Sequence, residues 1–190
     1  MDIINLGKFL KEKGEKDYRL KQIKKAVFCD LINNWDEATA LSKELREELK
    51  KEFPIASLEL LNLPAGEAGL IESKNKDSAK AVFKLEDGNC IETVLMKHLN
   101  TKEDDVKAGR NTVCISSQAG CAIGCGFCAT GKMGLKRNLT SEEIVDQVLF
   151  FARLLKKENQ AVNNVVFMGM GEPFLNYDNT IEAIRILNDK

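Results

Sequence analysis

Long apolar runs and an N-terminal export signal are both missing from this chain of 190 residues. Its longest apolar stretches, such as Val162 to Met170, are interrupted by polar residues and are far shorter than the about 20 residues that a membrane helix needs. The first five residues lack the basic segment and the apolar stretch of a signal peptide. We therefore expect a cytoplasmic protein that has no membrane partner.

A charge excess of one sign is also missing, because 28 Lys and Arg residues face 29 Asp and Glu residues. The whole chain therefore offers no global electrostatic argument for binding a nucleic acid. The charges are unevenly distributed, however: residues 1–25 hold eight basic and four acidic residues, and Lys132, Lys136 and Arg137 form a second basic cluster. For either cluster taken alone, a solvated surface is the more common explanation.

The first half of the chain changes from helical to strand periodicity. Asp17 is predicted to cap a helix that extends to Leu31, and a second helix is predicted to begin at Ser42. Residues 80–85 and 90–95 then alternate as strands do, and Asp87-Gly88 between them predicts a hairpin turn with positive φ at both positions. We expect a helical domain over residues 1–60 and a β-hairpin connector over residues 61–105.

The remaining residues, 106–190, predict an α/β fold. A strand at 112–116 is followed by a loop rich in glycine and cysteine, then by a helix that opens on a capping box of Thr140 and Glu143. A β-branched run, Val165 to Phe167, precedes a glycine-rich turn and a last helix from about Asn179. This order predicts two βα units with parallel strands.

Cysteine is the residue type that points most directly to chemistry. Cys29 and Cys90 are isolated, and we expect them to be packed structural thiols. Cys121, Cys125 and Cys128 have the spacing C-x3-C-x2-C, which lets three thiols converge on one soft metal centre.

A structural zinc site normally has a fourth ligand. His98 is the only histidine and lacks a paired ligand spacing, and Cys114 fits that role less well. Three cysteines suit a four-iron cluster that leaves one iron open.

A second motif follows the last predicted strand. Gly171 is small enough to let the backbone approach a ligand, and the carboxylate of Glu172 can accept a hydrogen bond from an ammonium group. Alone, this Gly-Glu-Pro sequence would be read as an ordinary turn at the end of a strand.

Together the two motifs resemble the radical S-adenosylmethionine (SAM) superfamily, in which an aromatic residue such as Phe127 precedes the third cysteine. The resemblance implies a [4Fe-4S] cluster on Cys121, Cys125 and Cys128, SAM at Gly171 and Glu172, and the first two βα units of a partial (βα)6 barrel. Four more blocks are similar to the RlmN/Cfr group of ribosomal-RNA adenine methyltransferases, and Gly171 to Tyr177 is closer to its RlmN branch. These blocks cover residues 17–23, 91–95, 114–121 and 135–140.

The resemblance to the RlmN branch implies methylation of C2 of an adenine in 23S rRNA, and possibly of a tRNA adenine, through a methylated cysteine. It implies that Cys114 is catalytic and forms a transient disulfide with that methylated cysteine, that Glu92 accepts a proton, and that a reductase or flavodoxin-type protein donates electrons. Residues 1–60 would dock the RNA through phosphate contacts.

The sequence also departs from this family. No cysteine follows Cys128, so the methyl-carrying cysteine has no counterpart, and two βα units stand where the family has about six. We therefore expect an N-terminal portion that is inactive alone. A C8-directed (Cfr-like) methyltransferase and a non-catalytic metal-cluster RNA-binding module remain the alternatives.

Overall fold

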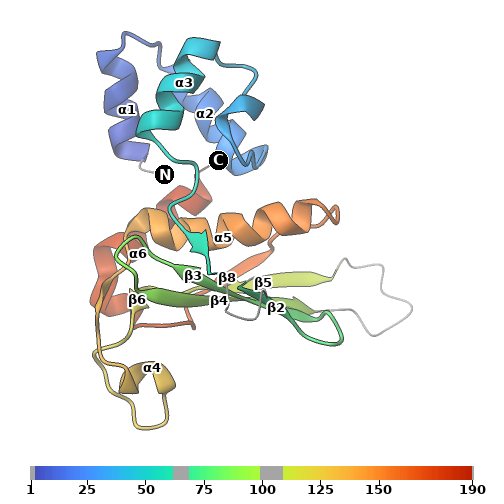
Figure 1. The fold of residues 1–190 in the computed structure, drawn as a ribbon, viewed down its shortest axis with the longest axis vertical. Coiled ribbons are helices and arrows are strands. Elements are labelled where there is room, and N and C mark those ends of the chain that lie inside the picture. Colours follow the sequence, from blue (N-terminus) through green and yellow to red (C-terminus); the bar gives the residue numbers. More distant parts are fainter. Residues whose placement is uncertain (1–2, 62–68, 99–108, 190) are drawn as a thin grey trace. The chain divides into compact units, whose positions relative to one another are not determined.

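The computed structural model describes residues 3–61, 69–98 and 109–189. The chain divides into two compact units, Met1–Ser57 and Leu58–Lys190 (Figure 1). The second unit contains both the predicted hairpin and the predicted βα units. The expected boundary between residues 105 and 106 lies outside the described residues.

The first unit is helical and has its own core. Its elements are α1 (Ile3–Glu12), α2 (Tyr18–Lys24), the π-helix η1 (Lys25–Cys29), the 3-10 helix η2 (Trp35–Glu37) and α3 (Lys43–Glu52). Leu6, Ile23, Val27 and Leu49 are fully buried, and the indole Nε1 of Trp35 donates to the carbonyl oxygen of Phe53 at 2.8 Å. Apolar side chains from every helix of this unit thus meet in one interior.

The helix starts in this unit were predicted with mixed success. The helix start predicted at Ser42 is confirmed, and the Ser42 hydroxyl caps α3 by accepting from the backbone N–H of Leu45. The capping role predicted for Asp17 is wrong, because its backbone is itself helical and its side chain makes no capping hydrogen bond. The helix also ends earlier than Leu31, which has a φ of 51°.

The second unit is built on a six-stranded sheet. Its order is β1 (Glu59–Leu60), β3 (Ser78–Lys84), β4 (Cys90–His98), β5 (Arg110–Cys114) and β8 (Asn164–Val166), with β2 (Leu70–Glu72) also paired to β3. Strands β3 and β4 form the predicted hairpin, with Lys84 opposite Cys90. The predicted turn geometry is wrong at Asp87, because only Gly88 has a positive φ in this longer connection.

The predicted parallel βα arrangement is confirmed. Val113 of β5 lies opposite Val165 of β8 in a parallel pair. Helix α5 (Ser141–Lys156) connects the two strands, begins at the predicted capping box and packs its Phe150 ring 5.0 Å from that of Phe83. Helix α6 (Tyr177–Asn188) follows β8 and contacts α5. None of the helices within the described ranges is long and apolar enough to cross a membrane.

A smaller, two-stranded sheet lies between β5 and α5 in the sequence. It pairs β6 (Gln118–Ala119) with β7 (Arg137–Asn138), and the segment between them contains the short helix α4 (Ala129–Lys132). We call residues 120–136 the cysteine loop. Figure 1 shows this loop and α4 extending away from the large sheet.

Candidate functional site

The two sequence motifs lie at the same edge of the sheet. The cysteine loop follows β5, and the Gly-Glu-Pro segment, residues 167–176, follows β8. Because β5 and β8 are parallel neighbours, their carboxyl ends meet at one edge, which is where α/β proteins commonly bind ligands. The carbonyl oxygen of Met170 accepts from the backbone N–H groups of Ser117 and Gln118 at 2.8 and 3.2 Å. The structure therefore joins the base of one motif to the base of the other.

The cysteine loop is closed at its base by close backbone packing. The N–H of Cys121 donates to the carbonyl oxygen of Gly134 at 3.2 Å. Gly120 has a φ of +78°, and a Cβ at this position would collide with that carbonyl oxygen. Any residue other than glycine would force the two ends of the loop apart.

The three candidate ligands are accessible within this loop. Cys121, Cys125 and Cys128 are free thiols of intermediate exposure. The backbone N–H of Gly131 and, to a lesser degree, that of Thr130 lower the pKa of the Cys128 thiol, which favours the thiolate that binds metals. Cys125 and Cys128 are also linked through their backbones, the N–H of Cys128 donating to the carbonyl oxygen of Cys125 at 3.0 Å.

This donor set fits a cluster better than a single ion. Nowhere in the part of the chain that the structure describes are three His, Cys, Asp or Glu side chains grouped closely enough to hold one metal ion. A four-iron cluster binds each thiolate through a different iron, so its ligands need not share one coordination sphere. Three accessible thiols on one glycine-containing loop meet this requirement. His98 is exposed at the end of β4.

The glycines of the Gly-Glu-Pro segment pack against the strand that leads to the cysteine loop. Gly171 has a φ of +96°, and a Cβ there would lie 2.5 Å from the Cβ of Gln118. A Cβ at Gly169 would lie 2.7 Å from the carbonyl oxygen of Ile115. The small size of these residues is therefore needed for contact between the two segments themselves.

Glu172 has a structural bond of its own. Its Oε1 accepts from the backbone N–H of Phe174 at 3.0 Å, which makes Glu172 the cap of the 3-10 helix η3 (Pro173–Asn176). The carboxylate is thus held in one orientation, and its other oxygen makes no bond to another described residue. That oxygen can accept from a ligand cation.

Cys114 and Glu92 lie on one face of the large sheet. Cys114 is opposite Val94 on β4, and Glu92 is two residues from Val94, so all three side chains point to the same side. Burial raises the pKa of the Cys114 thiol, which therefore stays protonated at neutral pH. Glu92 is half exposed and its Oε1 lies 3.0 Å from the Nζ of Lys80. The two residues share a face without a hydrogen bond between them in the described structure.

Two buried polar residues that we did not predict connect these parts. Gln147 of α5 accepts through Oε1 from the N–H of Ser116 at 2.8 Å, and its Nε2 donates to the carbonyl oxygen of Ser116 at 2.9 Å. The Ser116 hydroxyl donates to the carbonyl oxygen of Glu92 at 2.6 Å and accepts from the N–H of Met170 at 2.9 Å. A polar residue on the apolar face of a predicted helix is the signal in the sequence that would have identified Gln147.

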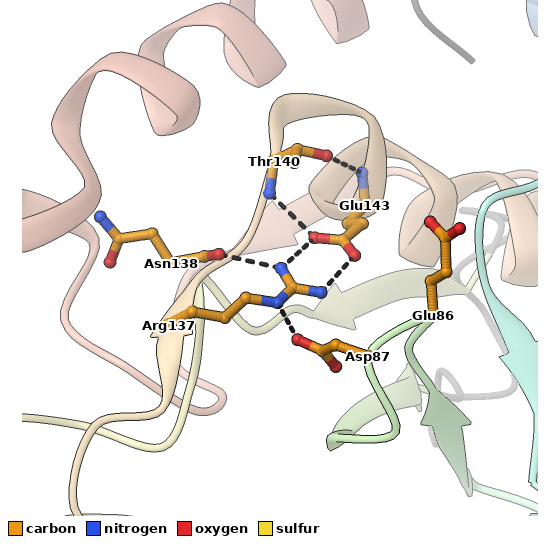
Figure 2. A pocket seen from close by; sticks show the side chains of 6 residues that line it. All are labelled: Glu86, Asp87, Arg137, Asn138, Thr140 and Glu143. Carbon is orange, nitrogen blue, oxygen red and sulfur yellow. Dashed lines mark hydrogen bonds and ion pairs between the residues drawn. The ribbon is translucent and has the colours of Figure 1, made fainter.

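Arg137 fastens the exit of the cysteine loop. Its guanidinium donates to both carboxylate oxygens of Glu143 at 2.7 Å and also binds Asp87 of the hairpin turn (Figure 2). The hydrogen bond from Arg137 is the main reason that the pKa of Asp87 falls to about 2, and Glu143 in turn raises the pKa of Arg137 above its ordinary value. The surface pocket at this point is lined by Glu86, Asp87, Arg137, Asn138, Thr140 and Glu143, none of which we predicted as a site residue.

The remaining cysteines correct one expectation. Cys29 and Cys90 are exposed and are not packed thiols, since neither side chain faces the core of its unit. All six cysteines are free, so the structure shows no disulfide, and the transient one implied by the resemblance would need the methyl-carrying cysteine, which has no counterpart after Cys128.

Two family models match this chain, one at each end. The model for the radical SAM superfamily matches residues 115–190, which include both motifs. The model for the ribosomal RNA large subunit methyltransferase N-terminal domain matches residues 1–55, which form most of the helical unit.

Individual relatives agree with the family models. The chain is 48% identical over 177 residues to a probable dual-specificity RNA methyltransferase RlmN of Thermotoga neapolitana, and the match covers 93% of this chain and 46% of the relative. A protein of the same name from Dictyoglomus thermophilum is 42% identical over 98% of this chain and 49% of its own length. The chain therefore spans about half the length of these curated relatives.

A solved structure extends the agreement to the fold. The crystal structure of a radical SAM methyltransferase from Sphaerobacter thermophilus superimposes with a TM-score of 0.85 at 38% identity, and covers 100% of this chain and 51% of that one. Radical SAM proteins use a [4Fe-4S] cluster and SAM. In its motifs, its fold and its relatives, the chain is similar to radical SAM proteins over residues 115–190 and to the N-terminal domain of the ribosomal RNA large subunit methyltransferases over residues 1–55.

Proposed function

We propose that this chain is the cluster- and SAM-binding part of an RNA methyltransferase that methylates C2 of an adenine in 23S rRNA, and also a tRNA adenine. The observation that carries the proposal is the meeting of the cysteine loop and the Gly-Glu-Pro segment at the carboxyl ends of β5 and β8. The relatives' name, probable dual-specificity RNA methyltransferase RlmN, supports the RNA substrate.

Each cofactor has residues of this chain to hold it. Cys121, Cys125 and Cys128 would bind the [4Fe-4S] cluster, and the free carboxylate oxygen of Glu172 would accept from the ammonium of SAM, next to the close-packed backbone of Gly171. When bound, the reduced cluster supplies the electron that cleaves SAM into a radical, which suits an aromatic carbon that is neither acidic nor nucleophilic. A reductase or flavodoxin-type donor would supply this electron.

Cys114 and Glu92 would act on the proton of the adenine. Cys114 presents a protonated thiol, because burial raises its pKa, and Glu92 presents a carboxylate on the same face of the sheet. We assign Glu92 as the proton acceptor and Cys114 as the thiol that assists loss of the C2 proton. Lys80 would hold the carboxylate of Glu92 in place through their ion pair.

The helical unit would bind the RNA backbone. Lys8, Lys11, Lys16 and Lys21 are exposed on α1, on α2 and between them, and no ion pair between described residues involves any of the four. Lysines in such a position neutralise phosphates without reading the base sequence. Binding of RNA by the chain should therefore weaken steeply as salt is raised, and an affinity that hardly changes between low and high salt would contradict this role.

Anaerobic reconstitution with iron and sulfide tests the cluster assignment. We expect a brown protein with about four irons per chain. Cys125→Ala should abolish iron loading, whereas Cys90→Ala is a matched control because it removes an exposed thiol outside the loop. Cys114→Ser should keep the full iron content. A colourless protein that binds zinc would instead favour the non-catalytic RNA-binding module.

A further inference from the structure

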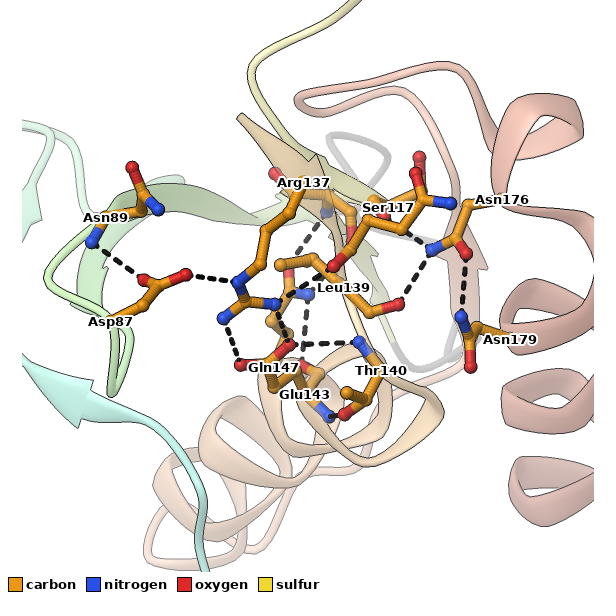
Figure 3. A network of polar contacts seen from close by, with 12 residues as sticks. Asp87, Asn89, Ser117, Arg137, Leu139, Thr140, Glu143, Gln147, Asn176 and Asn179 are labelled. Carbon is orange, nitrogen blue, oxygen red and sulfur yellow. Dashed lines mark hydrogen bonds and ion pairs between the residues drawn. The ribbon is translucent and has the colours of Figure 1, made fainter. Parts of the chain in front are cut away.

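Three amide side chains join the residues that flank the cysteine loop to the Gly-Glu-Pro segment. Gln118 donates through Nε2 to Oδ1 of Asn138 at 2.8 Å and accepts through Oε1 from the backbone N–H of Glu172 at 2.9 Å. Asn176 donates through Nδ2 to the carbonyl oxygens of Ser117 and Leu139, both at 2.8 Å. Figure 3 shows Asn176 between these two carbonyl groups. We call Gln118, Asn138 and Asn176 the amide bridge.

Gln118 is the central member of the amide bridge. Its side chain is fully buried, and Gly171 packs directly against its Cβ and Cγ atoms. The amide uses its donor on the strand that leaves the cysteine loop and its acceptor on Glu172. A buried amide with both ends bonded has one favourable position, because moving it would leave a polar group without a partner.

We propose that Gln118 is a positioning residue for SAM binding, which it serves by fixing the backbone of Glu172 relative to the cysteine loop. The inference rests on the proposed function, in which the three cysteines bind the cluster and Glu172 binds the SAM next to it. The carboxylate of Glu172 is held by its cap to η3, and the backbone of Glu172 is held by Gln118. Among the links between these segments, the bond from Gln118 is the one that holds Glu172 directly, and it does so through the backbone, so the carboxylate of Glu172 stays available for a ligand.

A merely structural role for Gln118 would lower stability without a specific effect on SAM. Asn111 provides the comparison, because it is also a buried amide and its Nδ2 donates to Oε1 of Gln160 and to the carbonyl oxygen of Ala161, both at 3.0 Å. It lies near the start of β5 and bonds neither to the cysteine loop nor to the Gly-Glu-Pro segment. Asn111→Leu thus removes the hydrogen bonds of a comparable buried amide outside the site.

The experiment uses the whole chain reconstituted with iron and sulfide. Gln118→Met keeps the approximate volume of the side chain and removes both hydrogen bonds. We expect its iron content to equal that of the wild type, because all three cysteines are intact. We expect the SAM concentration that half-saturates the change in the EPR spectrum of the reduced cluster to rise by about tenfold to a hundredfold. Asn111→Leu should leave this concentration unchanged while lowering the melting temperature comparably.

The outcomes separate the two proposals. If the wild-type chain binds no iron or shows no spectral response to SAM, the proposed function fails, and this inference fails with it. If the wild type responds and Gln118→Met responds at the same SAM concentration, only the positioning role is overturned. Should Gln118→Met fail to fold, Asn138→Ala takes its place, since Asn138 is exposed and its loss removes the partner of Nε2. A smaller shift in the same direction is then expected, because the bond between Gln118 and Glu172 remains, and an unchanged SAM concentration overturns the inference.

Discussion

The cysteine loop and the base on which it stands differ sharply in their packing. In the loop, Phe127 is 94% exposed and Met133 is 54% exposed, while at the base Ser116, Gln118 and Gln147 are fully buried. The loop carries the reactive thiols, and the base carries hydrogen bonds that join three separate segments of the chain. The comparison teaches that the reactive thiols and the hydrogen bonds that position them lie in different parts of the chain. The exposed loop can adjust to a cluster, whereas the base cannot move without leaving buried polar groups unpaired.

The largest effect is expected from breaking the base at Gln147. Gln147→Leu would leave the buried N–H and carbonyl groups of Ser116 without partners, so we expect the free energy of unfolding to fall by about 3 kcal/mol. Urea denaturation followed by circular dichroism measures this change. Gln160→Leu is the control, because Gln160 is exposed and accepts one bond, and it should cost less than about 1 kcal/mol. Equal losses in the two variants would mean that the base is no more rigid than the surface.

Arg137→Met should have the next largest effect. It leaves the nearly buried Glu143 without its bidentate partner, and we expect a loss of about 2 kcal/mol at neutral pH. Asp87 makes part of this difference dependent on pH. The pKa of Asp87 is lowered from 3.8 to about 2, mainly by Arg137 and further by hydrogen bonds from Asn89. The stability that the ionised Asp87 contributes is therefore present above pH 3.8 and is lost as pH falls through about 2.

Acid titration of stability checks this prediction. The advantage of the wild type over Arg137→Met should be smaller near pH 2 than near pH 5. Asp87→Asn is the matched control, since it keeps the bonds between Arg137 and Glu143 and removes the carboxyl group that titrates. If Asp87→Asn shows the same pH dependence as the wild type, another group is responsible.

Thr140→Ala should have a moderate effect on the base. The hydroxyl of Thr140 accepts from the N–H of Glu143 at the start of α5, and loss of such a cap costs about 1 kcal/mol. Thr140→Ser keeps the hydroxyl and should stay close to the wild type in thermal unfolding. If the alanine and serine variants were equally destabilised, the loss would come from the methyl group and the capping bond would not be its cause.

Phe127→Ala should have the smallest effect, because it changes the loop alone. Its ring is 94% exposed, so we expect the free energy of unfolding to change by less than about 0.5 kcal/mol. Phe174→Ala, in the Gly-Glu-Pro segment, is a control with a ring that is 78% exposed. A loss above about 1 kcal/mol at Phe127 would show that the loop is packed in solution, and the contrast with the base would disappear.

The predictions from sequence succeeded where the signal was local. The helix start at Ser42, the capping box at Thr140, the hairpin around Gly88 and the parallel strands were all predicted from local patterns in the sequence. The parallel arrangement in turn placed the two motifs at one edge of the sheet. Asp17 had the right residue type for a cap but continues the helical backbone, so its side chain cannot reach the free N–H groups.

The hydrogen bonds of the base could not be predicted in the same way. Gln118 and Glu172 are far apart in the sequence and meet only because β5 and β8 pair. An amide side chain in a sequence carries no sign of which distant backbone group it will bind. Arg137 was noted as part of a basic cluster, but the acidic partners that neutralise it, Asp87 and Glu143, come from two other elements.

The cap that Glu172 forms on η3 also has an entropic consequence. A free glutamate side chain loses rotamer entropy equivalent to about 1–2 kcal/mol when a ligand immobilises it. In this chain the hydrogen bond to the N–H of Phe174 has already selected one rotamer before any ligand arrives. A cation that binds the second oxygen of this carboxylate therefore meets a side chain whose disorder has been removed by folding, and more of the attraction between the charges remains as affinity.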